Sequence, residues 1–145
     1  MTGVDCSAVQ IDRARRLVPA ATFTRADVSD VDYPQGTFDA VVCLYVLIHL
    51  PLAEQPVLLC RIARWLRPGG WLLVTAGHDA WTGTEDRWLG GDAPMWWSHA
   101  DAATYRDWPA AAGFTVVEET FVPEGVGGHA LFWAVTEPER SFPAG

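Results

Sequence analysis

The stretch that decides the fold is "LRPGGWLLVT", residues 66–75. Its first half has the features of a helix end, with an arginine that suits the negative helix terminus and glycines that allow a left-handed turn. Its second half is an apolar run typical of a strand buried on both faces of a parallel sheet. A second run of this kind, "FDAVVCLYVL", occupies residues 38–47. A helix that leads directly into a buried strand indicates an α/β fold.

The rest of the chain continues this alternation in both directions. We predict strands of one mixed sheet at residues 2–5, 21–26, 38–43, 70–76, 114–122 and 128–136. We predict helices from a Ser7 cap to Leu17, from about Leu52 to Leu66, and from a Ser98 cap to about Ala112. Residues 78–98 contain four tryptophans and several glycines, and we expect an irregular loop with a functional role. The order predicts a doubly wound α/β sheet whose last two strands form an antiparallel pair.

Length and charge limit the classes of function. The chain has 145 residues, which suits a single domain over 1–145, and its net charge of -8 argues against nucleic acid or an anionic membrane surface as a partner. We expect neither a signal peptide nor a membrane span. Three scattered cysteines predict no disulfide framework, and we expect Cys43 and Cys60 to be small core residues. Reduced cysteines fit a cytoplasmic protein, and the four histidines lack zinc-site spacing.

Four stretches together resemble the class I S-adenosylmethionine-dependent methyltransferases of the small-molecule type. "GVDCS" is similar to the end of that family's second strand, and "ADVSD" to its adenine-binding turn. "FDAVVCLYVLIHLP" resembles the family's fourth strand and the turn after it, and "LRPGGWLLVT" the segment from a helix into the fifth strand. The family also has a central first strand followed by a glycine-rich turn. The resemblance therefore implies an N-terminally truncated methyltransferase domain.

The resemblance implies S-adenosylmethionine as the cofactor and assigns residues to it. Asp5, an acid at the carboxyl end of a strand, would accept the two ribose hydroxyls. Asp27 would bond the adenine amino group and the Val28 amide a ring nitrogen, with Cys6 beside them. Cys43, Leu44 and Tyr45 would form the floor near the sulfonium. Each also has an ordinary structural interpretation, as a turn residue for the acids and as core packing for the floor.

Three histidines and a tryptophan are candidates for the acceptor end of the site. His49 follows the strand at 38–47 and is the candidate catalytic base. Trp97 and His99, in "MWWSHAD", and His129, after the turn "EGVGG", are candidates for binding a small-molecule acceptor. The competing interpretation is that these rings are packed structural residues.

Two alternatives remain open. One is a non-catalytic methyltransferase-like remnant that acts through a partner chain, and the other is a nicotinamide-binding oxidoreductase, since Asp5 would also suit that ribose. Without the family's first strand, we expect weak binding of S-adenosylmethionine by this chain. We also expect unpaired edges on the strands at 2–5 and 38–43 that favour a homodimer, unless the two strands pair directly.

Overall fold

The computed structural model describes residues 1–125 and 127–138. The chain divides into two compact units, Met1–Tyr33 (unit 1) and Pro34–Gly145 (unit 2), and each is described by itself. Within the described residues, no helix has the length and apolar character needed to cross a membrane.

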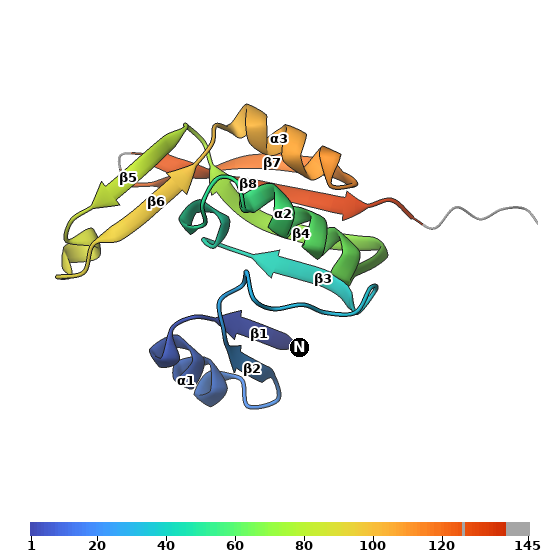
Figure 1. Cartoon of the computed structure of the whole chain (residues 1–145), viewed down its shortest axis with the longest axis horizontal. Coiled ribbons are helices and arrows are strands. Elements are labelled where there is room, and N and C mark those ends of the chain that lie inside the picture. The colour runs from blue at the N-terminus through green and yellow to red at the C-terminus, as the bar shows by residue number, and fades with distance from the viewer. Residues whose placement is uncertain (126, 139–145) are drawn as a thin grey trace, which may run out of the picture. The chain divides into compact units, whose positions relative to one another are not determined.

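Unit 1 is a small parallel β-α-β element (Figure 1). Strand β1 (Thr2–Asp5) pairs in parallel with β2 (Thr22–Arg25), and helix α1 (Ala8–Leu17) connects them. The helix begins where the sequence predicts, because the Ser7 hydroxyl accepts a hydrogen bond from the Gln10 amide at 3.4 Å. Both predicted strands and the predicted helix of this segment are confirmed.

Unit 2 contains a four-stranded sheet and a separate hairpin. Its elements in chain order are β3 (Phe38–Cys43), η1 (Leu47–His49), α2 (Gln55–Trp65), β4 (Leu66–Gly77), β5 (Trp81–Glu85), η2 (Trp88–Gly90), β6 (Met95–His99), α3 (Ala102–Ala111), β7 (Phe114–Glu124) and β8 (Gly127–Thr136). The sheet has the order β3-β4-β8-β7, with β3 parallel to β4 and the remaining pairs antiparallel. The predicted C-terminal antiparallel pair is therefore confirmed.

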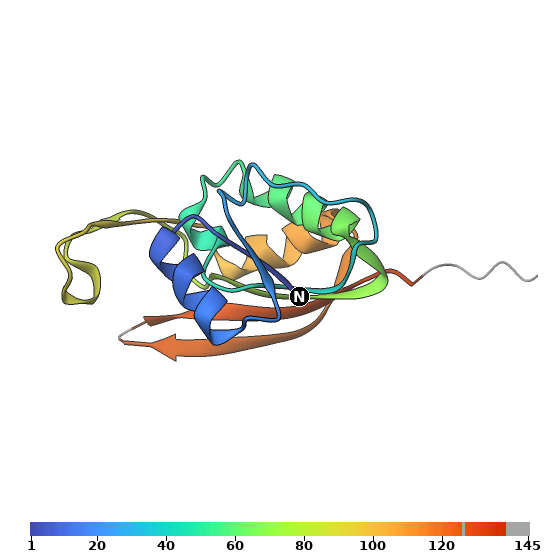
Figure 2. The same cartoon turned by 90° about the horizontal axis from the view of Figure 1, so that it is seen from below.

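The core of unit 2 lies between this sheet and helices α2 and α3, which contact each other and lie on the same side of β7 and β8 (Figure 2). Alternate residues of the central strands β4 and β8 point into it, and Val74 and Phe132 are 1% and 0% exposed. Helix α2 contributes Leu58, Leu59 and Ile62. Full burial of each such side chain stabilises the fold by about 1.5–3 kcal/mol. This packing sets the positions of the strand ends that carry the candidate site residues of unit 2.

The predicted single mixed sheet is wrong. Strand β1 pairs only with β2, and β3 pairs only with β4, among the described residues, so β1 and β3 do not pair directly either. Strand β3 is not buried on both faces as predicted, and Val42 is 65% exposed.

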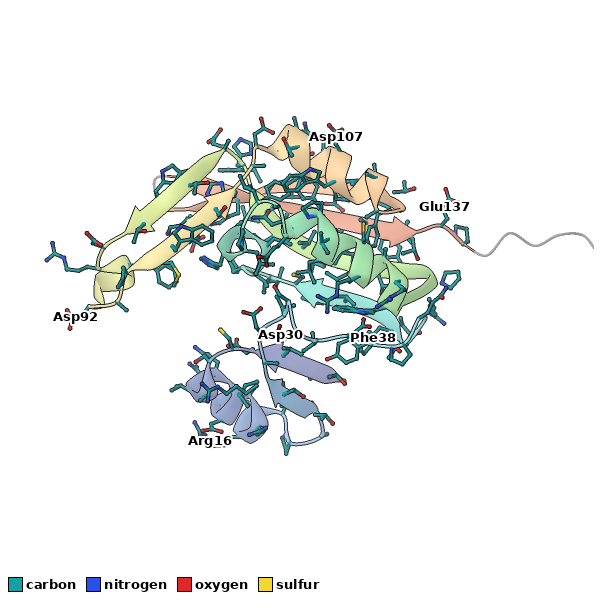
Figure 3. The ribbon with its side chains drawn as sticks, in the orientation of Figure 1. Arg16, Asp30, Phe38, Asp92, Asp107 and Glu137 are labelled. Atoms are coloured by element: carbon teal, nitrogen blue, oxygen red, sulfur yellow. The ribbon has the colours of Figure 1, made fainter. Side chains whose placement is uncertain are left out.

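The predicted irregular loop at 78–98 is also wrong. Its two ends pair as the antiparallel strands β5 and β6, with Trp81 opposite His99 and Glu85 opposite Met95, and η2 lies in the connection between them (Figure 1). Aromatic and β-branched residues favour strands, and here they outweigh the glycines. The turn between η2 and β6 includes Asp92 (Figure 3).

Two helix starts differ from the prediction. Ser98 lies inside β6 rather than at a helix cap, and Asp101 caps α3 by accepting a hydrogen bond from the Thr104 amide at 2.9 Å. Helix α2 begins at Gln55, because the residues before it form turns.

Of the two cysteine burial predictions, one is confirmed and one is wrong. All three thiols are free, and Cys43 is buried as expected, with burial raising its pKa to about 12. Cys60 is exposed, contrary to prediction, and so is Val57 at 57%. The reason is that the buried stripe of α2 passes through Leu58 and Leu59, which turns positions 57 and 60 toward solvent.

Candidate functional site

Unit 1 places two carboxylates at one edge of its sheet. Asp5 ends β1 and Asp27 follows β2, and because these strands are parallel their carboxyl ends lie at the same edge. Asp5 Oδ1 accepts from the Ser7 amide at 2.7 Å, and Asp27 Oδ1 accepts from the Ser29 amide at 2.8 Å. Each carboxylate is exposed and held in place by its own turn.

Asp5 also lines a cavity of about 250 Å³ in unit 1. The other lining residues come from β1, α1 and β2: Gly3, Val4, Gln10, Ile11, Ala14 and Phe23. A carboxylate beside mainly apolar walls has the chemistry to bind the hydroxyls and ring of a nucleoside, so the residues present fit the adenosine part of S-adenosylmethionine. Of the two neighbouring candidates, Cys6 is exposed, and Val28 is half-buried after β2.

The candidate cofactor residues of unit 2 follow the end of β3. Cys43 is buried, whereas Leu44 and Tyr45 are 42% and 43% exposed. Tyr45 has a left-handed backbone with φ of 56°, a conformation that costs a residue with a Cβ about 1–2 kcal/mol. Strain of this kind is concentrated at functional sites, so the turn at Tyr45 is a candidate site feature on independent grounds.

The predicted base and acceptor residues come together in unit 2. We define the Trp97 cluster as Tyr45, His49, Trp97, His99 and His129. The Trp97 ring lies 4.6 Å from that of His49 and 6.0 Å from that of His129, centroid to centroid. The His129 ring lies 6.4 Å from that of His99 and 5.4 Å from that of Tyr45. Five residues from positions 45 to 129 therefore form one aromatic and imidazole surface.

Hydrogen bonds fix the neutral tautomer of two of these histidines. His49 Nδ1 lies 2.8 Å from the Trp96 carbonyl oxygen, and His99 Nδ1 lies 2.6 Å from that of Asp79. A carbonyl can only accept, so in each neutral ring Nδ1 carries the proton and Nε2 keeps its lone pair. Each ring thus presents a proton acceptor of fixed orientation. Over residues 1–125 and 127–138, no group of three metal-binding side chains is placed to hold an ion.

His129 is the most buried of the histidines, with 8% exposure. Its Nε2 lies 3.2 Å from a Glu124 carboxylate oxygen. Burial lowers the pKa of His129 below its ordinary value. The charge on Glu124 and a weaker interaction with the Ala76 backbone oppose this shift, while His99 and His49 add to it. Nε2 therefore donates to Glu124 in the neutral ring, which leaves Nδ1 as an acceptor.

Two polar atoms of the Trp97 cluster, Trp97 Nε1 and His129 Nδ1, are buried without a hydrogen-bond partner in the part of the chain that the structure describes. The indole can only donate, and the neutral imidazole described above can only accept at Nδ1. Unsatisfied buried polar atoms are rare and costly in native structures. A polar group able both to accept and to donate would satisfy the pair, which is a chemical requirement that the sequence alone does not reveal.

A buried glutamine supports the cluster and was not identified from the sequence. Gln55 is fully buried, and its Nε2 donates to the carbonyls of Leu50 at 2.8 Å and Ser98 at 2.6 Å. Its Oε1 accepts from the Tyr105 hydroxyl at 2.5 Å. These bonds connect the segment after His49, strand β6 and helix α3. A signal was present, since Gln55 lies three residues before Leu58 on the buried stripe of α2.

Comparisons with known proteins identify the family. The sequence profile of the methyltransferase domain family matches residues 1–74. Phosphoethanolamine N-methyltransferase 3 of Arabidopsis thaliana is 32% identical over 79 residues, which cover 52% of this chain and 16% of that protein. Fatty-acid O-methyltransferase of Mycolicibacterium smegmatis is 31% identical over 96 residues, covering 65% of this chain and 34% of that protein. The chain thus corresponds to only a part of these relatives.

A solved structure shows the same fold. The 1,6-didemethyltoxoflavin-N1-methyltransferase of Burkholderia thailandensis, with bound 1,6-didemethyltoxoflavin and S-adenosylhomocysteine, matches with a TM-score of 0.72 and 21% identity. The match covers 94% of this chain and 60% of that one. The fold is the Rossmann-like α/β fold of methyltransferases with a C-terminal antiparallel strand pair. The chain belongs to the methyltransferase domain family, within the class I S-adenosylmethionine-dependent methyltransferases.

Proposed function

We propose that the chain takes part in S-adenosylmethionine-dependent methyl transfer to a small-molecule acceptor. Family membership supports the cofactor, and the names of the relatives support a small-molecule acceptor. They include both an N- and an O-methyltransferase, so they do not select the atom that is methylated. The observation that carries the proposal is the fixed tautomer of His49 within the Trp97 cluster, because it orients a proton acceptor among rings able to hold an acceptor molecule.

Residues of each unit are proposed to contact the cofactor. Asp5 would accept hydrogen bonds from the ribose hydroxyls and Asp27 from the adenine amino group, as acceptor-only carboxylates can. The remaining proposed contacts are Cys6, Val28, Cys43, Leu44 and Tyr45. When bound, S-adenosylmethionine supplies a methyl group on a positively charged sulfur. That both units form one methyltransferase-like domain over 1–145 is part of the proposal.

The acceptor end would need few specialised groups. Methyl transfer depends mainly on proximity and alignment of the reactants, and a base is needed only for an acceptor that must lose a proton. His49 Nε2 is proposed as that base. Trp97, His99 and His129 are proposed to line the acceptor site, where their rings would exclude water and the two unpartnered polar atoms would orient a polar group.

Calorimetry and a transfer assay test the proposal together. S-adenosylmethionine is titrated to millimolar concentration, because we expect the affinity of this chain to be weaker than low micromolar. Transfer of a labelled methyl group is then followed with a panel of small amines, alcohols and acids. Saturable heat with transfer that depends on the chain supports the proposal. No heat with either the cofactor or its demethylated product contradicts it and favours the non-catalytic remnant. Quenching of the tryptophans by NADH alone would favour the oxidoreductase, against the family match.

A further inference from the structure

A cavity of about 360 Å³ in unit 2 adjoins the Trp97 cluster at His99. It is bounded by the start of β5, the end of β6 and the first turn of α3. The lining residues are Leu52, Ala80, Trp81, Thr82, His99, Ala100, Asp101 and Thr104. His99 therefore belongs both to the cluster and to this cavity. What the cavity can bind follows from the polar groups along its wall.

Asp101 supplies a fixed negative charge. Its Oδ1 accepts from the Thr104 amide at 2.9 Å, which caps helix α3. That backbone bond lowers the pKa of Asp101, and the positive charge of Arg106 adds to the effect, so the side chain is ionised at neutral pH. A full carboxylate charge exceeds the roughly +0.5 charge of a helix N-terminus, and the net charge at this end of the cavity is negative.

Trp81 and His99 supply two further electron-rich surfaces. Their ring centroids lie 6.1 Å apart, and Trp81 is 45% exposed. The face of an indole attracts cations. His99 Nδ1 is bound to the Asp79 carbonyl, so Nε2 of the neutral ring is a hydrogen-bond acceptor. A carboxylate, an indole face and an imidazole lone pair all favour a ligand that is positively charged or rich in N–H donors.

Among the described residues, no lysine or arginine lines the cavity, so none of them offers a counter-charge to an anionic ligand there. The cation that acts on Asp101 from the same helix is Arg106, and it is already engaged. Its Nε and Nη2 donate to the two carboxylate oxygens of Glu119 at 2.6 and 2.9 Å. Paired arginine and glutamate in this two-fold geometry form a strong, oriented interaction, which keeps the guanidinium directed at Glu119.

We propose that this cavity binds an amine and, because His99 lines both the cavity and the proposed acceptor site, that the acceptor methylated by this protein is an amine. The second statement rests on the function proposed above. The bound ammonium first releases one N–H proton, which frees the nitrogen lone pair. That lone pair then forms the new N–C bond while the methyl–sulfur bond breaks with its electron pair left on sulfur. His99 Nε2 and His49 Nε2 are the candidate receivers of that proton, the first on the cavity wall and the second on the cluster.

Direct binding of matched probes tests the proposal without the cofactor. Benzylamine, benzyl alcohol and benzoate have one ring and differ in the polar group, and their affinities are measured by calorimetry or by chemical-shift changes on the full chain. We expect benzylamine to bind at least tenfold more tightly than either of the others. Equal affinity for the amine and the alcohol would overturn the proposal.

Asp101→Asn is the decisive variant, because asparagine also caps helices but carries no charge. We expect it to weaken benzylamine binding at least tenfold and to leave benzyl alcohol binding unchanged. Asp107→Asn is the matched control on the same helix, since Asp107 is exposed and does not line the cavity (Figure 3). Thermal midpoints of the two variants show whether folding is retained, and Trp81→Leu provides a second test of the wall if Asp101→Asn fails to fold.

The amine-binding test and the methyl-transfer test can fail independently of each other. Amine binding that depends on Asp101, in a chain that transfers no methyl group, would support the cavity and contradict the proposed function. Methyl transfer to alcohols or acids, with no preference for the amine probe, would support the function and overturn the amine inference.

Discussion

The two groups of candidate residues, one in each unit, are built in different ways. In unit 1, each carboxylate is oriented by an amide two residues further along the chain, Asp5 by Ser7 and Asp27 by Ser29. In unit 2, the Trp97 cluster joins residues as distant as Tyr45 and His129. The carboxylates are exposed, whereas Trp97 and His129 are each 8% exposed. Local hydrogen bonds therefore suffice to orient the first part, and the second depends on the tertiary fold.

Replacement of Trp97 by alanine is expected to cause the largest loss of stability among the substitutions that follow. Removal of a buried tryptophan leaves a cavity, and we expect Trp97→Ala to lower the free energy of unfolding by about 3–5 kcal/mol. The neighbouring Trp96 is 40% exposed, and Trp96→Ala is the control, with an expected loss under about 1 kcal/mol. Urea denaturation measures both. Equal losses for the two variants would show that the cluster is not a packed part of unit 2.

Loss of the Gln55 side chain is expected to have the next largest effect. Gln55→Leu removes the donor to the Leu50 and Ser98 carbonyls and the acceptor of the Tyr105 hydroxyl, which leaves buried polar atoms unsatisfied. We expect a loss of about 2–3 kcal/mol in the free energy of unfolding. Gln35→Leu changes an exposed glutamine of the same unit and should change it by less than about 0.5 kcal/mol. An unchanged denaturation midpoint for Gln55→Leu would contradict its supporting role.

A smaller effect is expected from pH through His129. Burial holds its folded-state pKa below the ordinary value of 6.5, so the unfolded chain binds more protons between the lowered pKa and 6.5. This contribution to stability is complete above that window and decreases as the pH falls through it. Thermal midpoints between about pH 7.5 and about pH 5.5 should therefore fall less steeply in His129→Gln than in the wild type. If the thermal midpoints of the wild type and of His129→Gln fall in parallel with pH, the lowered pKa of His129 is contradicted.

The smallest expected effect concerns the free edge of β3. Val42 is 65% exposed on this edge strand, and exposed apolar edges recruit other strands, so we expect weak, concentration-dependent dimerisation. Val42→Lys should abolish it in sedimentation experiments. Val9→Lys changes a valine that is 74% exposed on α1 and should leave it intact. A monomer at every concentration of the wild type would contradict this prediction.

The features that could be predicted from the sequence are those that depend on nearby residues. The Ser7 cap, the strand at 38–43 and the turn at Asp27 depend on nearby residues, and the structure agrees with each. The hairpin β5–β6 was missed because its glycines suggest a loop, whereas pairing along its length outweighs them. The buried stripe of α2 signals that Gln55 is buried, but not its bonds to Ser98 and Tyr105, which lie 43 and 50 residues away. The lack of a partner at Trp97 Nε1 and His129 Nδ1 also depends on the tertiary fold and could not be predicted.

The most direct test of the account measures cofactor affinity and methyl-transfer rate in the same two variants. We predict that Asp5→Asn weakens binding of S-adenosylmethionine by roughly tenfold or more, since it alters a charged hydrogen-bond acceptor. We predict that His49→Gln leaves the affinity within about twofold and slows single-turnover methyl transfer by about 100-fold or more. His78→Gln, an exposed histidine outside the Trp97 cluster, is the control and should change neither. A His49→Gln variant that transfers methyl groups at the rate of His78→Gln would contradict the account.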